Sequence, residues 1–249
     1  MRHFFLEEIE AEKGKVSITG QEARHIFKVL RMKKGERFVL IDARGRRFQT
    51  VIETSGPKEI IAEIESALPS PPRSPVTVTI CQALLKSGNM DLIVQKTSEL
   101  GVDRICPFIS ARTVVTLDNK KISERMEHWK KIARSSTEQS GRIVPVQIDT
   151  MHTFASLLAG LGPDDACKVI LWEGEASLDL KTVLRSSEPL NNFIGIVGPE
   201  GGFEKEEIEE AKKAGFIPVT LGQRTLRSET ASLALSAIVQ YESGDLNLI

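Results

Sequence analysis

The chain has 249 residues, of which 41% are hydrophobic and 27% are charged, and its formal net charge is −1. This length allows one large or two ordinary domains with sizeable cores. The apolar stretches are too short to span a bilayer and the N-terminus lacks the apolar core of a signal peptide, which favours a cytoplasmic protein over a membrane protein. The three cysteines are scattered and the four histidines do not cluster, so we expect neither a disulfide framework nor a metal site.

Residues 1–68 are predicted to form a small β-rich domain. Its β-type runs cover residues 37–41, 48–52 and 60–64, and turn-forming segments separate them. One helix interrupts the pattern, because Thr19 and Glu22 have the spacing of a capping box and apolar residues at positions 23, 26, 27 and 30 then share one face. We therefore expect a small β-barrel that carries one helix.

Basic residues are concentrated in that domain. Residues 24–47 contain nine Lys or Arg against two acidic residues, and a weaker excess, eight against four, covers residues 112–142. A single charge run is most often a solvated face. In a slightly acidic protein, however, a compact basic segment is the pattern expected of contacts with nucleic-acid phosphates. The candidate RNA-binding residues are Arg2, Arg24, Lys28, Arg31, Lys33, Lys34, Arg46 and Arg142.

Residues 69–75 (PSPPRSP) contain four prolines and are predicted to be a semi-rigid linker to a second domain at 76–249. In that second domain short apolar runs alternate with longer amphipathic segments. Strands are predicted at 76–81, 104–109, 144–148, 168–172, 193–197 and 216–221, and helices at 90–100, 120–138, 152–158, 178–186, 203–214 and 231–241. This alternation predicts an α/β fold whose mainly parallel sheet is covered on both faces.

The predicted helix at 231–241 is apolar nearly all round. A helix without a polar face has to be buried, either under its neighbours or against a partner subunit. Because a twofold interface is the commonest way to cover such a surface, we expect a homodimer.

Two glycine-marked turns follow predicted strands near the C-terminus. GPEGG at 198–202 follows the run at 193–197, and LGQRTLRSETA at 221–231 follows the run at 216–220. Open α/β sheets bind their ligands at such carboxyl ends of strands. Neither of the usual glycine-rich phosphate-binding patterns occurs, and glutamates crowd the start of the helix at 203–214. The turns therefore favour a nucleoside ligand without phosphates, of a cationic kind, over a dinucleotide or a triphosphate.

These residues resemble the SPOUT class of RNA methyltransferases, and within it the RsmE family. The resemblance covers essentially the whole chain: MRHFF, HIFKVLRMKKGE, QKTSELGVDRICPF, SSTEQSGRIVP, GPEGGF and LGQRTLRSETA. It implies a PUA-like RNA-binding β-barrel followed by a SPOUT-type parallel sheet with a C-terminal trefoil knot. It also implies S-adenosylmethionine as cofactor, a homodimer that completes its active site across subunits, and methylation of uracil N3 in 16S ribosomal RNA or the small ribosomal subunit.

On this interpretation Arg227 and Glu200 are the candidate catalytic residues. Uracil N3 has to lose a proton, and a basic group at O2 or O4 would stabilise the resulting anion. The alternative for Arg227 is a structural ion pair with Glu229 or Glu200. From SSTEQSGRIVP, Glu138, Gln139 and Arg142 are candidates for a contribution to the partner's site.

The candidate cofactor-binding residues combine apolar walls with glycines that let the backbone approach the ligand. They are Leu171, Trp172, Glu173, Gly198, Pro199, Gly201, Gly202, Leu221, Gly222, Leu226, Ser228 and Thr230. Core packing at a strand end would also explain Leu171 and Trp172, and helix capping would also explain Ser228 and Thr230.

Two other functions stay open from the residues alone. A SPOUT enzyme that methylates ribose 2′-O or guanine would keep the cofactor turns but change the basic domain. A non-catalytic RNA-binding protein would explain the basic segment but not both glycine turns.

Overall fold

The structure is a computed structural model in which the chain divides into two compact units. It describes residues 2–6, 8–9, 14–42, 44–69, 74–86, 88–114, 119–161, 165–174, 178–187 and 189–246. Unit 1 comprises Met1–Pro72 with Thr137–Val144, and unit 2 comprises Arg73–Ser136 with Pro145–Ile249. The second segment of unit 1 had no signal in the sequence; its Ile143 packs beside the buried Phe5, Val39 and Ile41. Residues 70–73 of the predicted linker lie outside the described residues.

Unit 1 is a five-stranded sheet with one short helical segment. The strands are β1 (His3–Leu6), β2 (Lys15–Thr19), β3 (Arg37–Asp42), β4 (Arg47–Ser55) and β5 (Glu59–Leu68), in the order β1-β3-β4-β5-β2. β1 runs parallel to β3, whereas the other pairs are antiparallel. Phe4, Phe38 and Ile26 lie in its core. The three predicted runs fall within β3, β4 and β5, whereas β1 and β2 were not predicted.

The helix of unit 1 differs from its prediction. The α-helical part, α1 (Gly20–Arg24), is one turn long, and a π-helical turn at His25–Val29 continues it. Thr19 is the N-cap residue, but its side chain makes no capping hydrogen bond, so the predicted capping box is wrong. After the π-helical turn, Arg31 has a φ of 51°, in the left-handed region that a non-glycine residue rarely adopts.

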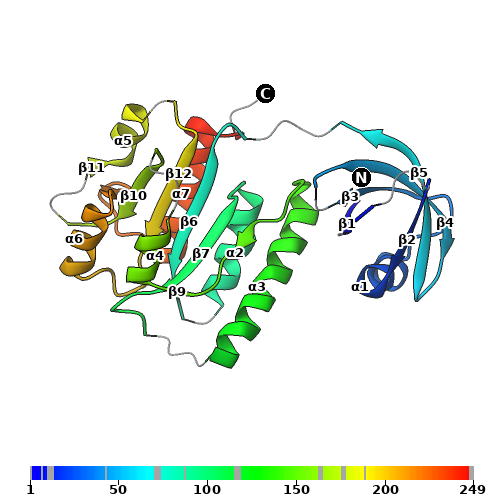
Figure 1. Ribbon diagram of the computed structural model, residues 1–249, viewed down its shortest axis with the longest axis horizontal. Helices are drawn as coiled ribbons and strands as arrows, with labels where there is room; N and C mark the ends of the chain where they lie inside the picture. The colour runs from blue at the N-terminus through cyan, green and yellow to red at the C-terminus, as the bar shows by residue number, and fades with distance from the viewer. Residues whose placement is uncertain are drawn as a thin grey trace. The chain divides into compact units, whose positions relative to one another are not determined.

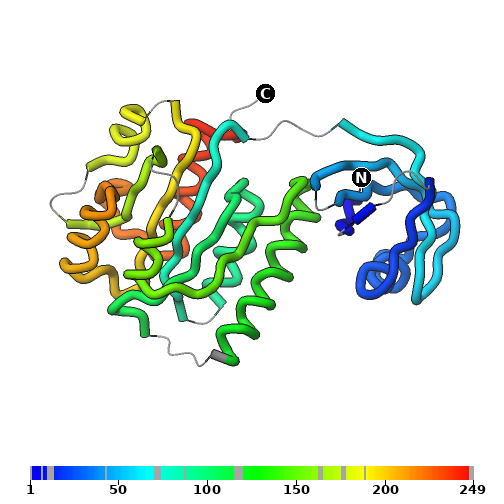
Figure 2. Tube along the Cα trace, viewed as in Figure 1, coloured from blue at the N-terminus to red at the C-terminus, as the bar shows by residue number. Residues whose placement is uncertain are grey.

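Unit 2 contains a sheet whose described strand pairs are all parallel, as predicted. The strands are β6 (Thr77–Ala83), β7 (Arg104–Ile109), β8 (Gln147–Ile148), β9 (His152–Thr153), β10 (Cys167–Leu171), β11 (Leu178–Asp179), β12 (Asn192–Val197) and β13 (Ile217–Thr220). Their order is β11-β13-β10-β12-β6-β7-β8, and β9 also pairs with β7. β6 and β12, far apart in the sequence, therefore lie side by side (Figure 2).

Helices cover both faces of this sheet, which confirms the predicted α/β layering. They are α2 (Asn89–Glu99), α3 (Asn119–Ser140), α4 (Phe154–Gly160), α5 (Leu180–Ser186), α6 (Lys205–Lys213) and α7 (Ser228–Ser243). One core contains side chains of α2, α3, α5 and α7, and the core on the opposite face contains those of α4 and α6 (Figure 1). The knot implied by the resemblance stays a prediction.

α7 is not buried all round, which corrects the prediction from its composition. Its buried side faces β6 and β12 and includes Ser232 and Gln240 as well as apolar residues. α7 can approach β12 closely because a Cβ at Gly195 would lie only 2.5 Å from Leu235 Cδ2. On the opposite side Ile238 is 37% and Tyr241 62% exposed.

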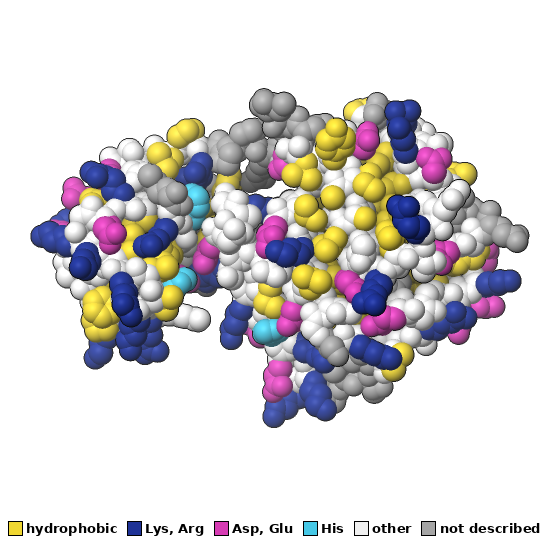
Figure 3. Space-filling model, turned by 180° about the vertical axis from the view of Figure 1, so that it is seen from behind, with side chains coloured by type: hydrophobic (Ala, Val, Ile, Leu, Met, Phe, Trp, Pro, Cys, Tyr) yellow, Lys and Arg dark blue, Asp and Glu magenta, His cyan; other side chains and the backbone are white. Residues whose placement is uncertain are grey.

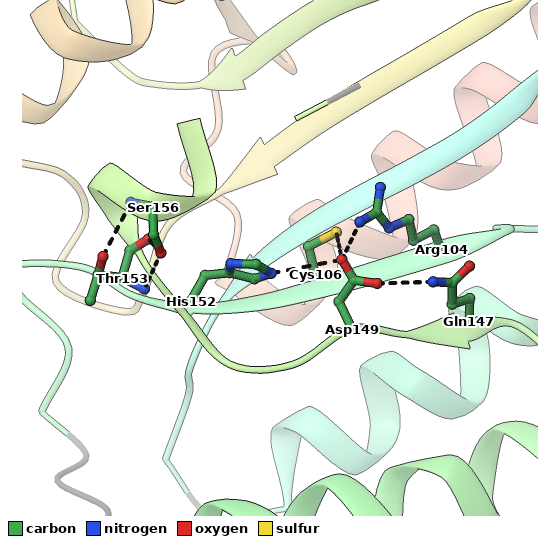
Figure 4. Close-up of polar contacts among 7 residues, drawn as sticks. All are labelled: Arg104, Cys106, Gln147, Asp149, His152, Thr153 and Ser156. Carbon is green, nitrogen blue, oxygen red and sulfur yellow. Dashed lines mark hydrogen bonds and ion pairs between the residues drawn. The ribbon is translucent and has the colours of Figure 1, made fainter. Parts of the chain in front are cut away.

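Asp149 connects the strands at the β7 edge of the sheet (Figure 4). It forms an ion pair with Arg104, accepts a hydrogen bond from the Cys106 thiol at 3.4 Å, and lies 3.7 Å from His152 Nε2. Its other oxygen accepts a bond from Gln147 Nε2 at 3.2 Å. Burial is the largest single effect and opposes ionisation of Asp149. The hydrogen bond and charge of Arg104, together with the Cys106 thiol and His152, outweigh it, so the pKa of this carboxyl lies below its usual value. The cluster therefore stabilises this edge through an ionised carboxylate.

Among the helices of the described residues, none is long and apolar enough to cross a membrane. Within the same residues, no three His, Cys, Asp or Glu side chains are placed to hold a metal ion.

Candidate active site

A pocket of about 720 Å³ lies within unit 2 at the carboxyl ends of β10, β12 and β13. Both glycine-marked turns border it, as does the first turn of α7. It is lined by Asn89, Arg112, Leu171, Trp172, Glu173, Val197, Gly198, Pro199, Glu200, Gly201, Gly202, Phe203, Val219, Thr220, Leu221, Arg224, Thr225, Leu226, Arg227, Ser228, Glu229 and Ala231. The volume is in the range of small-molecule sites.

The turn at 198–202, which we call the cofactor turn, is held from three directions. The Ser228 hydroxyl donates to the Gly198 carbonyl at 2.5 Å, and the Lys86 backbone N–H donates to Glu200 Oε1 at 3.1 Å. From the other side the Arg112 guanidinium donates to the Gly201 carbonyl at 3.1 Å. The turn is therefore fixed before any ligand binds.

The glycines of the two turns are needed for different reasons. A Cβ at Gly198 would lie 2.8 Å from the Phe203 ring, and one at Gly201 would lie 3.2 Å from Arg112 Cβ. These two glycines therefore make room for protein side chains. Gly202 and Gly222 have φ values of 70° and 111°, so they provide the left-handed backbone of the turns.

The loop after β10 also lines the pocket, with Trp172 and Glu173. The Trp172 ring folds back over Gly174, where a Cβ would lie 2.1 Å from the ring, and Lys212 Nζ lies 5.9 Å from the ring centre. Thr225 Oγ1 donates to Glu173 Oε2 at 3.3 Å, which connects this loop with the turn after β13. Trp172 both packs at the edge of the core and lines the pocket, so core packing does not exclude the predicted contact with a ligand.

Arg227 is the N-cap residue of α7, and its side chain is exposed at the pocket. In the described part of the chain it forms no ion pair, so the structural pairing with Glu229 or Glu200 is not formed. The segment after β13 thus presents an unpaired guanidinium to the pocket.

The glutamates after the cofactor turn have structural roles. Glu207 is buried, and its two carboxylate oxygens accept hydrogen bonds from the backbone N–H groups of Glu204 and Ala111, at 2.9 and 3.0 Å. Among the acidic residues at 200–207, Glu200 alone lines the pocket. Capping of α6 therefore accounts for Glu207, and Glu204 and Glu206 lie outside the pocket.

Most of the predicted catalytic and cofactor-binding residues line the same pocket. The exceptions are Gly222 and Thr230, which are exposed and do not line it. Asn89 and Arg112 line the pocket but were not predicted. Each follows the carboxyl end of a strand, β6 and β7 respectively, and that position in a βα unit is the signal that could have identified them.

The pocket fits a nucleoside with a cationic centre. Leu171, Leu221 and Leu226 provide apolar wall, while the backbone of the cofactor turn offers donors and acceptors to a ring edge. Glu173, Glu200 and Glu229 bring negative charge to it, which suits a cationic centre, while Arg112, Arg224 and Arg227 bring positive charge. These residues suit the adenosine and the sulfonium of S-adenosylmethionine.

The predicted RNA-binding residues of unit 1 differ in exposure and in their partners. Five of them, Arg24, Lys28, Arg31, Lys33 and Lys34, are exposed, and in the described residues none of these five side chains has a carboxylate partner. We call these five the basic patch. Arg46 differs, because its guanidinium bonds the buried Asp42 carboxylate at 2.6 Å and the Ile9 carbonyl at 3.1 Å. Arg2 is exposed, and Arg142 is partly buried.

Comparison with protein families shows two matches. A model described as an RNA methyltransferase domain matches residues 72–240, and one described as an RNA methyltransferase PUA domain matches residues 18–65. Among curated relatives, the ribosomal RNA small subunit methyltransferase E of Bacillus subtilis is 33% identical over 98% of this chain and 97% of its own. That of Aquifex aeolicus is 30% identical over 92% of this chain and 96% of its own.

Solved structures agree with these matches. A ribosomal RNA small subunit methyltransferase E from Neisseria gonorrhoeae, bound to S-adenosyl methionine, superimposes with a TM-score of 0.90 at 32% identity over 99% of both chains. A putative methyltransferase from Legionella pneumophila, in complex with the cofactor SAM, gives a TM-score of 0.85 at 30% identity over 93% of both chains.

Proposed function

The chain belongs to the ribosomal RNA small subunit methyltransferase E family of RNA methyltransferases, and we propose that it methylates uracil N3 in 16S ribosomal RNA, using S-adenosylmethionine. The observation that carries this proposal is that both glycine-marked turns line one and the same pocket, together with the unpaired Arg227. Action on ribosomal RNA also agrees with the predicted cytoplasmic location.

We assign the cofactor to this pocket. S-adenosylmethionine supplies a methyl group already activated on a sulfonium. The remaining task of the protein is to hold that group in line with the attacking atom, which is mostly a matter of positioning. Leu171, Leu221 and Leu226 would enclose the adenine, and the cofactor turn would approach it through its backbone. The fixed geometry of the turn supports this role, because little ordering remains to be done on binding.

Arg227 and Glu200 are assigned to the reacting base. The N3–H of uracil lies on the Watson–Crick edge, so the base has to be unpaired or turned out of its helix. A guanidinium at O2 or O4 would stabilise the anion left by loss of the N3 proton. Arg227 has the exposure and the lack of a partner that this role needs. Glu200 also lines this pocket, and its side chain accepts a hydrogen bond from the Lys86 N–H.

The basic patch of unit 1 is assigned to RNA phosphates. Its five cations lie within eleven residues, from Arg24 at the end of α1, through the π-helical turn, to Lys34, and Val29 beside them is 69% exposed. Because these cations have no carboxylate partners in the described residues, they can bind phosphates without first breaking an ion pair. Arg46 fits this role less well, because its guanidinium already holds Asp42 in place.

We also propose a homodimer that buries the exposed side of α7. Ile238 and Tyr241 belong to an apolar stripe with the half-exposed Leu233, Ala234 and Ala237, and Leu92 of the adjoining α2 is 39% exposed. Figure 3 shows hydrophobic side chains gathered on this face of unit 2. A second copy would cover the stripe symmetrically.

The decisive experiment is to incubate the protein with small ribosomal subunits and labelled S-adenosylmethionine, and to identify the methylated nucleoside by mass spectrometry. The proposal expects 3-methyluridine. A 2′-O-methylated nucleoside or a methylguanosine would show a different target on the same fold. Absence of S-adenosylhomocysteine binding by calorimetry would exclude the enzyme altogether and leave an RNA-binding protein.

A further inference from the structure

Three buried polar side chains connect β6, α7 and the cofactor turn beneath the pocket. Gln82 is the penultimate residue of β6, and its neighbour across the sheet is Val197, the last residue of β12. Ser228 and Ser232 lie on the first turns of α7, and both are buried. Gln82 is fully buried and does not line the pocket, so it cannot act by touching the cofactor.

Hydrogen bonds fix the Gln82 side chain completely. Its Nε2 donates to the Ala83 carbonyl at 2.9 Å and to Ser228 Oγ at 3.0 Å. Its Oε1 accepts a bond from the Ser232 hydroxyl. With the donors and the acceptor both in use, the amide has one orientation, and it imposes one position on Ser228.

Ser228 passes this restraint to both sides of the pocket. Its hydroxyl, having accepted a bond from Gln82, donates to the carbonyl of Gly198, the first residue of the cofactor turn. Its backbone follows directly on Arg227, the N-cap residue of α7. The same serine therefore sets the distance between the cofactor turn and the guanidinium that faces the base.

We infer that Gln82 is a positioning residue for methyl transfer, which acts through Ser228 to hold the N-terminus of α7 against the cofactor turn. The inference rests on the proposed function, which assigns the cofactor to this pocket. Gln82 would align the methyl group with the base by fixing the two elements that hold them.

α7 offers a matched control at its other end. Gln240 is also a fully buried glutamine; its Nε2 donates to the Gly101 carbonyl at 2.8 Å, and its Oε1 accepts a bond from the Asp245 N–H at 3.2 Å. It does not line the pocket. Replacing either glutamine by methionine removes buried hydrogen bonds at nearly constant volume, but only one replacement frees Ser228.

The test measures thermal stability, S-adenosylhomocysteine affinity by calorimetry, and single-turnover methylation of small ribosomal subunits. We expect Gln82→Met and Gln240→Met to lower Tm to a similar extent. Because a misplacement of about 1 Å can cost on the order of a hundredfold in rate, Gln82→Met should slow methyl transfer at least about tenfold and weaken S-adenosylhomocysteine binding. Gln240→Met should leave both within about twofold of wild type.

Three results would overturn the inference. Wild-type affinity and rate in Gln82→Met would do so, as would equal losses of affinity and rate in Gln240→Met. The third is additivity with Ser228→Ala, because two residues that act through one contact should not have independent effects. If Gln82→Met does not fold, Ser232→Ala removes only the hydroxyl that holds Gln82 Oε1, and should slow transfer in the same direction. A wild-type protein that binds no S-adenosylhomocysteine would instead overturn the proposed function.

Discussion

Replacing Arg227 by alanine removes an exposed side chain that has no ion-pair partner in the described residues. The free energy of unfolding should therefore change by less than about 0.5 kcal/mol. One preorganised donor to a developing oxyanion is worth about 3–4 kcal/mol, which corresponds to a 10²–10³-fold loss of rate. Because Arg227 is exposed in the free chain, we expect the lower end, about a hundredfold.

The assay is single-turnover methylation of small ribosomal subunits, with Tm and S-adenosylhomocysteine affinity measured in parallel. Arg227→Lys keeps the charge but loses the planar fork, so its rate should fall between those of wild type and Arg227→Ala. Without the guanidinium the N3 proton has to leave unaided, so the rate of Arg227→Ala should rise more steeply with pH than that of wild type. A rate within threefold of wild type, or a Tm lowered by several degrees, would refute the assignment.

Three further predictions concern the turn, the RNA contact and the β7 edge. Gly201→Val should displace Arg112 and the cofactor turn, weakening S-adenosylhomocysteine binding on the order of tenfold or more by calorimetry, with Tm nearly unchanged. Replacing Arg24, Lys28 and Arg31 together should flatten the salt dependence of RNA binding by about two to three units of slope, measured by filter binding, and leave cofactor affinity unchanged. Asp149→Asn should have a lower Tm than the wild type at pH 7, and this difference in Tm should disappear in acid. The reason is that a carboxyl with a depressed pKa stabilises the fold above its unfolded pKa of about 3.9, and this stabilisation is lost as the pH falls through the folded value.

The elements that could be predicted from the sequence are those with a strong local pattern. Residues 193–197 are a continuous apolar run, and β12 extends it by one residue. β9 and β11 were included in the predicted helices at 152–158 and 178–186, because each is two residues long and is defined only by its pairing, with β7 and β13. The π-helical turn likewise had no local signal.

The residues of the site likewise divide into those with a local sequence pattern and those that only the strand order brings together. The cofactor turn could be found because glycine and a strand end coincide within a few residues. Gln82, Asn89 and Arg112 come from the ends of β6 and β7, about 90 to 115 residues earlier, and only the strand order β12-β6-β7 brings them to the turn. The role of Gly201 also required the structure, since the residue it makes room for, Arg112, is distant in sequence.

The homodimer can be tested by placing a charge in the apolar stripe of α7. Ile238→Glu would bury one unpaired carboxylate from each subunit, at a cost of several kcal/mol, and should weaken association at least about a hundredfold. Leu178 is 51% exposed, more than Ile238, but it lies on the edge strand β11, whereas α7 packs against β12 and β6 near the middle of the sheet. Leu178→Glu is therefore the control, and sedimentation equilibrium should find it dimeric. Wild-type association in Ile238→Glu would place the interface elsewhere.

Mixing two inactive variants tests whether each active site draws on both subunits. Arg227→Ala removes the group assigned to the base, and Arg142→Ala removes the candidate contribution from the partner. If the two residues act across the interface, each mixed dimer has one intact site, and random exchange of subunits should restore about a quarter of the wild-type rate. If both act within one subunit, every site in the mixture lacks one of them and no activity returns. A wild-type chain that sediments as a monomer at micromolar concentration, and still methylates RNA at full rate, would contradict the dimer itself and leave the stripe on α7 exposed in the working enzyme.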